Sequence, residues 1–328
     1  MKKLNKISSI LLCFLLMLFT ACGSTEAKVA DDKLEKTKTE MQKTEQAKID
    51  KAEEKIANSI KEGSNNTTVN GNLKVHFIHV GQADSILIHE PSGKSMFIDA
   101  ANNDDSDLVV TYLRAQGISK LDYVVGTHPH EDYIGGVDVA INTFDIENVI
   151  LSKATSSTKT YKDVLLSIKN KGLKVITATG EKTFDLGNSK CEIVAPNGSD
   201  YEDLNNYSVV IKVTYGNNSF LFTGYVEDIS ENEMLSKGYN LKADLLKVEH
   251  HGSHSSTTPQ FLKAVSPKYA IISVGKDNKY GHPAQEILSK LSSVRVHVYR
   301  TDKMGTIIAT SDAKPQGYGA CKKCHPPK

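Results

Sequence analysis

Several features that identify common enzyme classes are missing from this 328-residue sequence. It has no GxSxG nucleophile elbow, no P-loop and no Rossmann glycine pattern, which leaves little support for nucleophilic-serine, NTPase or dinucleotide-binding functions. It also lacks a charge excess, because 40 basic residues face 39 acidic ones, and from residue 72 onward the counts are 28 and 29. Global electrostatics therefore give no case for nucleic-acid binding, and only a local basic groove remains open.

The sequence has only five cysteines, and their positions predict different roles. Cys13 falls within the N-terminal apolar run, and Cys191 lies in a strand-like run where a packed thiol is expected. Cys321 and Cys324 form a CxxC motif that an oxidising exterior would close into a local disulfide. With His325 the motif also matches c-type haem attachment, but the chain ends three residues later, leaving no room for a haem pocket. The alternative is the end of a small cysteine-containing surface module.

The longest apolar run near the N-terminus, residues 10–19, is too short for a membrane-spanning helix. Basic residues precede it and Thr20, Ala21 and Cys22 follow it, which predicts a secretion signal over residues 1–21. The small residues before Cys22 resemble the lipobox of bacterial lipoproteins, although Phe19 stands where leucine is usual. The resemblance implies lipidation of Cys22 and anchoring to the outer face of the cell membrane. An uncleaved anchor or an ordinary signal peptide is the alternative, and export follows in either case.

Residues 22–71 are predicted to be a charged tether, helical or disordered. From Ser24 to about Ser64 the composition is Lys, Glu, Thr, Ala and Gln without aromatic residues. A coiled-coil helix is the sharper alternative, but the apolar positions keep no sustained heptad.

Residues 72–313 alternate β-rich runs with amphipathic segments, and residues 314–328 form the tail. Strands are expected at 73–79, 84–89, 95–99, 121–125, 148–151, 173–178, 190–194, 207–215, 218–223, 245–249, 269–274, 294–300 and 305–310. Helices are expected at 107–116, 161–170, 226–237, 259–265 and 283–291. Hairpin-like strand pairs in both halves, with helices between them, predict an α+β fold of two packed sheets covered by helices.

One loop, Thr127–Gly136, directly follows the expected strand at 121–125. In it His128, His130 and Asp132 occupy alternate positions, so in an extended loop their side chains leave on the same side. Two imidazoles and a carboxylate are a ligand set for zinc and similar divalent ions. The alternative is a polar surface loop that happens to be rich in histidine.

Six motifs occur in the order and spacing of a known family: residues 79–87, Phe97–Ala100, His128–Asp132, Thr223–Gly224, His250–Ser253 and Tyr280–Pro283. Over about residues 72–311 the chain resembles the metallo-β-lactamase superfamily, most closely the domain of ComEC-like competence proteins and its free-standing relatives. The resemblance implies a four-layer αββα sandwich with a metal cleft along one edge of the sheets.

The resemblance also implies a ligand set. His128 and His130 match ligands of a first metal, Asp132 matches a ligand of a second and a catalytic residue, and His251 matches the last metal histidine, with neighbouring His250 supporting it. Asn206 corresponds to the third ligand of the first metal and would bind weakly or through water, or else serves turn chemistry. Asp99 matches the outer carboxylate that supports the metal loop.

Further residues match the substrate side of the family's cleft. Gly252, Ser253 and Ser255 are expected to face a phosphate, and His282 is expected to donate to a phosphate or leaving group. Asp84 matches a catalytic aspartate of the subgroup, although Ala83 replaces the glycine before it, and an ordinary turn carboxylate is the alternative.

Two positions depart from the family pattern. Tyr133 stands where a metal histidine is usual, and Tyr225 where a bridging carboxylate is usual. A phenol keeps its proton until pH near 10, so it is a poor ligand for a divalent ion. Both losses fall on the second metal.

The sequence thus predicts an exported, monomeric, metal-dependent hydrolase with one or two Zn²⁺ or Mn²⁺ ions. Its implied substrate is a phosphodiester, namely nucleic acid taken up or processed at the cell surface. The rival prediction is a non-catalytic binding module that keeps the fold and the cleft but has lost the metal chemistry.

Overall fold

The computed structural model describes residues 71–314 and 318–319. The predicted signal peptide, Cys22, the tether up to residue 70 and the Cys321–Cys324 pair lie outside the described residues and stay predictions. Within the described ranges, no helix combines the length and apolar character needed to cross a membrane.

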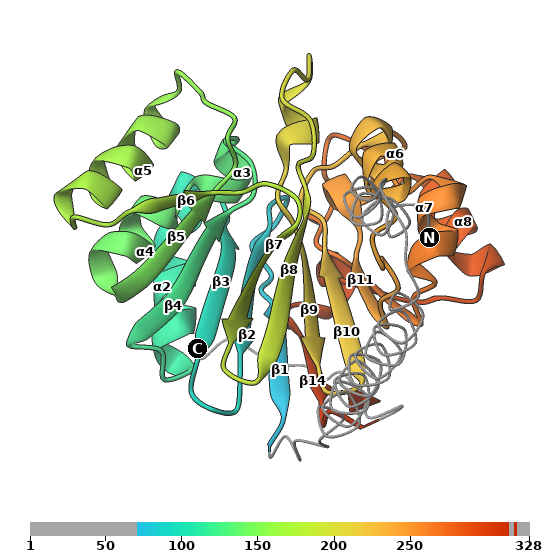
Figure 1. Cartoon of the computed structure of the whole chain (residues 1–328), viewed down its shortest axis with the longest axis horizontal. Coiled ribbons are helices and arrows are strands. Elements are labelled where there is room, and N and C mark those ends of the chain that lie inside the picture. Colours follow the sequence, from blue (N-terminus) through green and yellow to red (C-terminus); the bar gives the residue numbers. More distant parts are fainter. Residues whose placement is uncertain (1–70, 315–317, 320–328) are drawn as a thin grey trace, which may run out of the picture. The chain divides into compact units, whose positions relative to one another are not determined.

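The first sheet has eight strands in the order β15-β14-β1-β2-β3-β4-β5-β6 (Figure 1). Strands β3 to β6 run parallel, and β1, β2 and β14 pair antiparallel. The bounds are β1 (Leu73–Phe77), β2 (Ser85–His89), β3 (Ser95–Ala100), β4 (Lys120–Gly126), β5 (Asp145–Leu151), β6 (Val175–Thr177), β14 (Ile307–Ser311) and β15 (Tyr318–Gly319).

The second sheet has seven strands in the order β13-β12-β11-β10-β9-β8-β7. Strands β10 to β13 run parallel, whereas β7, β8, β9 and β10 pair antiparallel. The bounds are β7 (Lys182–Leu186), β8 (Ser189–Ala195), β9 (Val210–Tyr215), β10 (Asn218–Phe222), β11 (Leu245–Lys247), β12 (Tyr269–Ile272) and β13 (His297–Arg300).

Helices cover the outer face of each sheet (Figure 1). The first sheet carries α2 (Ser106–Ala115), α3 (Glu131–Ile134), α4 (Val137–Thr143) and α5 (Lys159–Asn170). The second carries α6 (Asp228–Lys237), α7 (Pro259–Val265) and α8 (Gln285–Ser293), and α9 (Thr301–Met304) leads into β14. The short 3₁₀ turns are η1 (Asn103–Asp105), η2 (Leu204–Tyr207) and η3 (Glu249–Gly252).

Three apolar clusters hold these four layers together. One lies between the two sheets, one between the first sheet and its helices, and one between the second sheet and its helices. Strand β3 is buried along its whole length, as expected for a strand covered on both faces. The expected αββα sandwich is therefore confirmed.

All the expected strands and helices are present, with boundaries shifted by a few residues. Strand β7 was not predicted, because most of its residues are exposed and polar and only Leu186 is fully buried. Cys191 is fully buried and burial raises the pKa of its thiol, so the prediction of a packed cysteine is confirmed.

The loop that carries His128 and His130 is fixed to the end of β3 by backbone hydrogen bonds. The amides of Gly135 and Gly136 donate to the carbonyls of Ala101 and Ala100, at 2.8 and 3.1 Å. A Cβ atom on Gly135 would lie 2.2 Å from the Asn102 carbonyl carbon. Only glycine lets the two backbones approach this closely.

We therefore predict that Gly135→Ala lowers the free energy of unfolding by about 2 kcal/mol or more, because backbone rather than a side chain must move. Gly238→Ala is the matched control. Gly238 has φ 72° but open space around it, so only the left-handed backbone should cost about 1 kcal/mol. Denaturant unfolding of both variants measures the difference, and equal losses would contradict the packing argument.

Candidate functional site

The predicted site residues gather where parallel strands of both sheets end. Strand β3 brings Asp99 near its carboxyl end, and the loop Thr127–Gly136 follows β4. In the second sheet, residues 248–256 follow β11 and residues 273–284 follow β12. The carboxyl ends of parallel strands are where ligands bind in α/β sheets.

Asp99 anchors the histidine loop. Its Oδ1 accepts the Thr127 amide at 2.8 Å and its Oδ2 accepts the Thr127 hydroxyl at 2.7 Å. Burial raises the pKa of Asp99 well above its usual range, and the two Thr127 hydrogen bonds only partly oppose this. This position is consistent with the supporting role that the resemblance implied.

Asp84 has a different position from the one expected of a catalytic residue. It is buried, and its Oδ2 lies 2.8 Å from Nζ of Lys247, which is fully buried on β11. The Lys247 ammonium also donates to the Val248 carbonyl at 3.0 Å. The covered carboxylate pairs with an ammonium from the other sheet, which favours a structural role, and the catalytic role of Asp84 stays a prediction.

His128 and His130 lie together with their rings nearly perpendicular and their centroids 4.1 Å apart. Burial, and secondarily the neighbouring His130, lowers the pKa of His128 to about 3, so its ring is neutral at pH 7. Neither of its buried ring nitrogens makes a well-formed hydrogen bond, and the Leu204 carbonyl acts on the ring only weakly. A neutral imidazole with free nitrogens is the form that binds a metal ion.

Asp132 and His251 face each other from opposite sheets. Nδ1 of His251 is 2.9 Å from the Ser273 carbonyl, which can only accept, so this nitrogen carries the proton. Nε2 of His251 lies 3.4 Å from Oδ2 of Asp132, and it can donate there and stabilise the carboxylate only when it also carries a proton. Burial alone would raise the pKa of Asp132, but contacts with His251 and Tyr225 outweigh it and lower the pKa.

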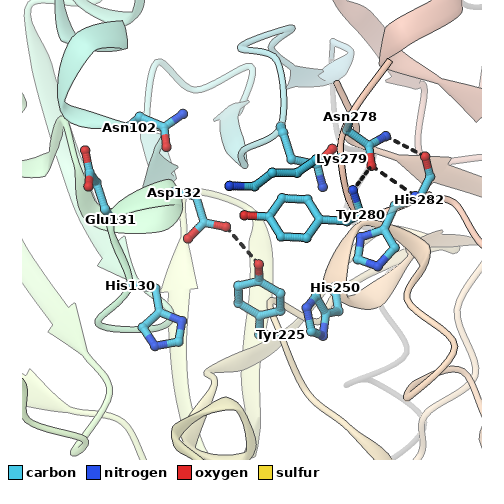
Figure 2. Close-up of a pocket in the computed structure, with 11 residues that line it drawn as sticks. Asn102, His130, Glu131, Asp132, Tyr225, His250, Asn278, Lys279, Tyr280 and His282 are labelled. Atoms are coloured by element: carbon cyan, nitrogen blue, oxygen red, sulfur yellow. Dashed lines mark hydrogen bonds between the residues drawn. The ribbon is translucent and has the colours of Figure 1, made fainter. Parts of the chain in front are cut away.

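Tyr225 lies at the centre of the site. Its hydroxyl donates to Oδ2 of Asp132 at 2.8 Å (Figure 2). Its ring centroid lies 3.8 to 6.1 Å from the ring centroids of His128, His130, His250 and His251. The histidines that the sequence separates by more than a hundred residues therefore converge, as predicted, but they converge around a phenol.

A second ion does not fit these residues. Burial raises the pKa of both Tyr133 and Tyr225, so both phenols keep their protons. The Tyr225 hydroxyl already donates its proton to Oδ2 of Asp132 in a hydrogen bond. The Tyr133 ring is fully buried, with its centroid 4.6 Å from that of the Tyr225 ring. The expected second ligand set is therefore replaced by two neutral aromatic side chains.

One ion fits the His128 and His130 pair, because their imidazoles are adjacent and the nitrogens of His128 are unpartnered. Within residues 71–314, no three His, Cys, Asp or Glu side chains are close enough to enclose an ion. His128 and His130 would thus supply two protein ligands for one ion, and water or substrate would have to complete the shell.

His250 was expected to support His251 from behind, but the structure places it at the cavity wall. Both residues have left-handed backbone, with φ 46° and 52°. His251 points into the protein, whereas Nδ1 of His250 lies 3.4 Å from Oε1 of Glu227, without good hydrogen-bond alignment. Glu227 also accepts the Ser255 hydroxyl at 2.8 Å, so it is a supporting carboxylate that the sequence analysis missed.

The expected phosphate-binding turn is used for internal packing. The Ser253 amide donates to the His250 carbonyl at 2.9 Å, and the Gly252 carbonyl accepts the Ala284 amide at 2.8 Å. A Cβ on Gly252 would lie 2.6 Å from Cβ of Pro283. The Ser255 hydroxyl is bonded to Glu227, and none of Gly252, Ser253 and Ser255 lines the cavity, so their phosphate contact stays a prediction.

Asn206 also has a structural partner. Its side-chain oxygen accepts the Ser230 amide at 3.1 Å, in the first turn of α6. This bond fixes the helix against η2 and favours the turn alternative, while the ligand role of Asn206 stays a prediction.

A cavity of about 540 Å³ opens over the site (Figure 2). It is lined by Gln82, Asn102, His130, Glu131, Asp132, Tyr225, His250, Asn278, Lys279, Tyr280 and His282. Burial and the nearby histidines lower the pKa of His282 to about 4, so its ring is neutral in the free protein at pH 7. Gln82 and Tyr280 both lie within motifs named from the sequence, whereas no sequence signal identified Lys279 as a lining residue.

The Asp84 and Lys247 pair generates a stability prediction. Lys247→Met leaves a buried carboxylate unpaired and should lower the free energy of unfolding by about 3 to 5 kcal/mol. Adding Asp84→Leu should recover much of that loss. Lys268→Met is the control, since Lys268 forms a half-exposed pair with Asp244 that should contribute less than about 1 kcal/mol. Additive losses in the double variant, measured by denaturant unfolding, would show that the two side chains do not interact.

The two tyrosines generate a metal prediction. Tyr133→His combined with Tyr225→Asp should raise bound zinc from about one to about two ions per chain, because it restores an imidazole and a carboxylate. Tyr225→Phe removes only the proton donor and should leave the stoichiometry unchanged. Elemental analysis after dialysis measures this, and two ions in the unaltered protein would refute the assignment.

Comparison with known proteins identifies the family of the chain. Residues 79–276 match the family described as the metallo-beta-lactamase superfamily. ComE operon protein 3 of Bacillus subtilis (strain 168) is 30% identical over 251 residues, which cover 71% of this chain and 32% of that protein. Competence protein ComA of Neisseria gonorrhoeae is 26% identical over 240 residues, which cover 69% of this chain and 30% of that protein. The match thus spans about a third of each relative.

Among solved structures, a metal-dependent hydrolase of the beta-lactamase superfamily aligns with a TM-score of 0.47 and 14% identity, covering 70% of this chain and 95% of that one. The family match covers more than half of the sequence and includes His128, His130, Asp132 and His251. The chain therefore belongs to the metallo-β-lactamase superfamily.

Proposed function

We propose that this chain is an exported, metal-dependent phosphodiesterase that acts on nucleic acid at the outer face of the bacterial cell membrane. The observation that supports it most is the adjacent pair His128 and His130, with unpartnered nitrogens on His128, beside an open cavity. The signal and lipidation motif support the location, and relatives named as competence proteins support nucleic acid as the substrate.

His128 and His130 would hold one Zn²⁺ or Mn²⁺ ion. Such an ion lowers the pKa of a bound water and polarises a phosphoryl oxygen. Asp132 is kept ionised by His251 and Tyr225, and its second oxygen points away from Tyr225 toward the His130 side of the cavity (Figure 2). That oxygen is free to accept a proton from the attacking water.

His282 lies on the opposite wall, with its ring centroid 5.6 Å from that of His250. Its Nδ1 is buried without a partner, and its neutral ring has one N–H to donate. Asn278 holds it in place by accepting the His282 amide at 3.0 Å and donating to its carbonyl at 2.7 Å. In this mechanism His282 orients the phosphate and stabilises the departing oxygen by hydrogen bonding.

A non-catalytic binding module is the second candidate. It is favoured by the hydrogen bond from Tyr225 to Asp132 and by the presence of only two firm ligands. In that case the cavity would bind its ligand without changing it.

The variant His128→Ala distinguishes the hydrolase from the binding module. If the chain is a hydrolase, the variant should hydrolyse bis(p-nitrophenyl) phosphate and single-stranded DNA at least about a hundredfold more slowly. The reason is that loss of the ion removes several kcal/mol of transition-state stabilisation. Bound metal should fall in parallel. His297→Ala is the matched control, since His297 is exposed on β13 and its ring packs on Tyr269. The hydrolase proposal fails if zinc- or manganese-loaded protein shows no hydrolysis above that of His128→Ala.

A further inference from the structure

The segment between β12 and α8 forms a rigid arm over the cavity. Asn278 makes four hydrogen bonds within it, donating to the Gly275 and His282 carbonyls and accepting the Tyr280 and His282 amides, at 2.7 to 3.2 Å. The Gly275 amide also donates to Oε1 of Gln82 at 3.0 Å, which ties the arm to the first sheet. Lys279 and Tyr280 are thereby presented from a fixed turn.

Tyr280 is unusual among the large apolar side chains of the described residues, because 59% of it is exposed and it nevertheless lines the cavity. Its ring is stacked on His282, with centroids 5.7 Å apart and planes inclined by 24°. In Figure 2 its hydroxyl points across the cavity toward Asp132. The rings of Tyr280 and His282 together form an aromatic platform at the wall of the cavity.

Lys279 adds a cation beside this platform. Its Nζ lies 5.2 Å from the centroid of the Tyr280 ring, and the side chain extends over the cavity in the same direction (Figure 2). An exposed cation–π contact of this kind is weak, so the flexible ammonium can leave the ring for a phosphate. A base can then stack on the aromatic face, which is the stronger interaction.

We propose that Lys279 and Tyr280 form a nucleotide-recognition arm, in which Tyr280 stacks on a base and Lys279 binds the adjoining phosphate of a single strand. The proposal rests on the proposed function, because it names the substrate of the same cavity. A single strand fits the arm better than a duplex, because only unpaired bases can be splayed onto an aromatic ring. The cavity volume is within the range of small-ligand sites and accommodates one nucleotide.

Binding in EDTA tests the arm without hydrolysis. Fluorescence anisotropy with the full chain should show labelled single-stranded dT10 binding about five- to a hundredfold more tightly than an abasic decamer with the same number of phosphates. Tyr280→Ala should remove this preference, and Tyr280→Phe should keep it because the ring remains.

Lys279→Gln should weaken binding of both decamers and reduce the dependence of log K on log salt by about one. Lys276→Gln is the matched control, since Lys276 carries the same charge on the same segment but does not line the cavity. It should change neither quantity.

Equal affinity for the two decamers, no binding of either, or a Tyr280→Ala variant that keeps the preference would overturn the proposal. Its failure is distinguishable from that of the proposed function. Base-dependent binding without hydrolysis in Zn²⁺ or Mn²⁺ would refute the phosphodiesterase and leave the arm standing. Hydrolysis without a preference for the decamer that carries bases would refute the arm and leave the phosphodiesterase standing.

Discussion

The buried ion pair between Asp84 and Lys247 is the interaction on which the site depends. Asp84 precedes β2 in the first sheet and Lys247 ends β11 in the second, so their 2.8 Å contact joins the two halves of the sandwich. Asp84 also lies 3.9 Å from Nδ1 of His251. Since both side chains are almost completely buried, each depends on the other as its charged partner. The strand ends that carry the histidines are held at a constant separation as a result.

Above this pair, the site is organised by a phenol where the family pattern has a metal-bridging carboxylate. Tyr225 touches four imidazoles through its ring and Asp132 through its hydroxyl. Its phenol keeps its proton, so the histidines converge around a side chain that is a poor ligand for a divalent ion.

The sequence was sufficient for the fold and for the convergence of the histidines. Apolar strand runs identify β1 to β6 and β8 to β14, and alternate polar residues after β4 identify His128, His130 and Asp132. Orientation within the motifs could not be predicted. The sequence does not show that His250 lines the cavity, and an isolated lysine in an apolar strand does not reveal that its partner is Asp84, 163 residues earlier.

The Gly252-Ser253 turn shows the same limit. Small residues after a strand are compatible with anion binding, but here Gly252 packs tightly against Pro283. Such competition between backbone partners is settled by three-dimensional contacts, which a local pattern does not contain. Tyr280 belonged to a recognised motif, but its position over the cavity could not be predicted, because it depends on the turn that Asn278 closes.

The left-handed backbone at His250 and His251 also limits how this chain can diversify. Because the two side chains leave the turn on different sides, inserting or deleting a single residue between β11 and Gly252 would exchange the buried and the open imidazole. Relatives that vary in length at this point would need a compensating change elsewhere. This short segment should therefore tolerate substitutions better than changes in length.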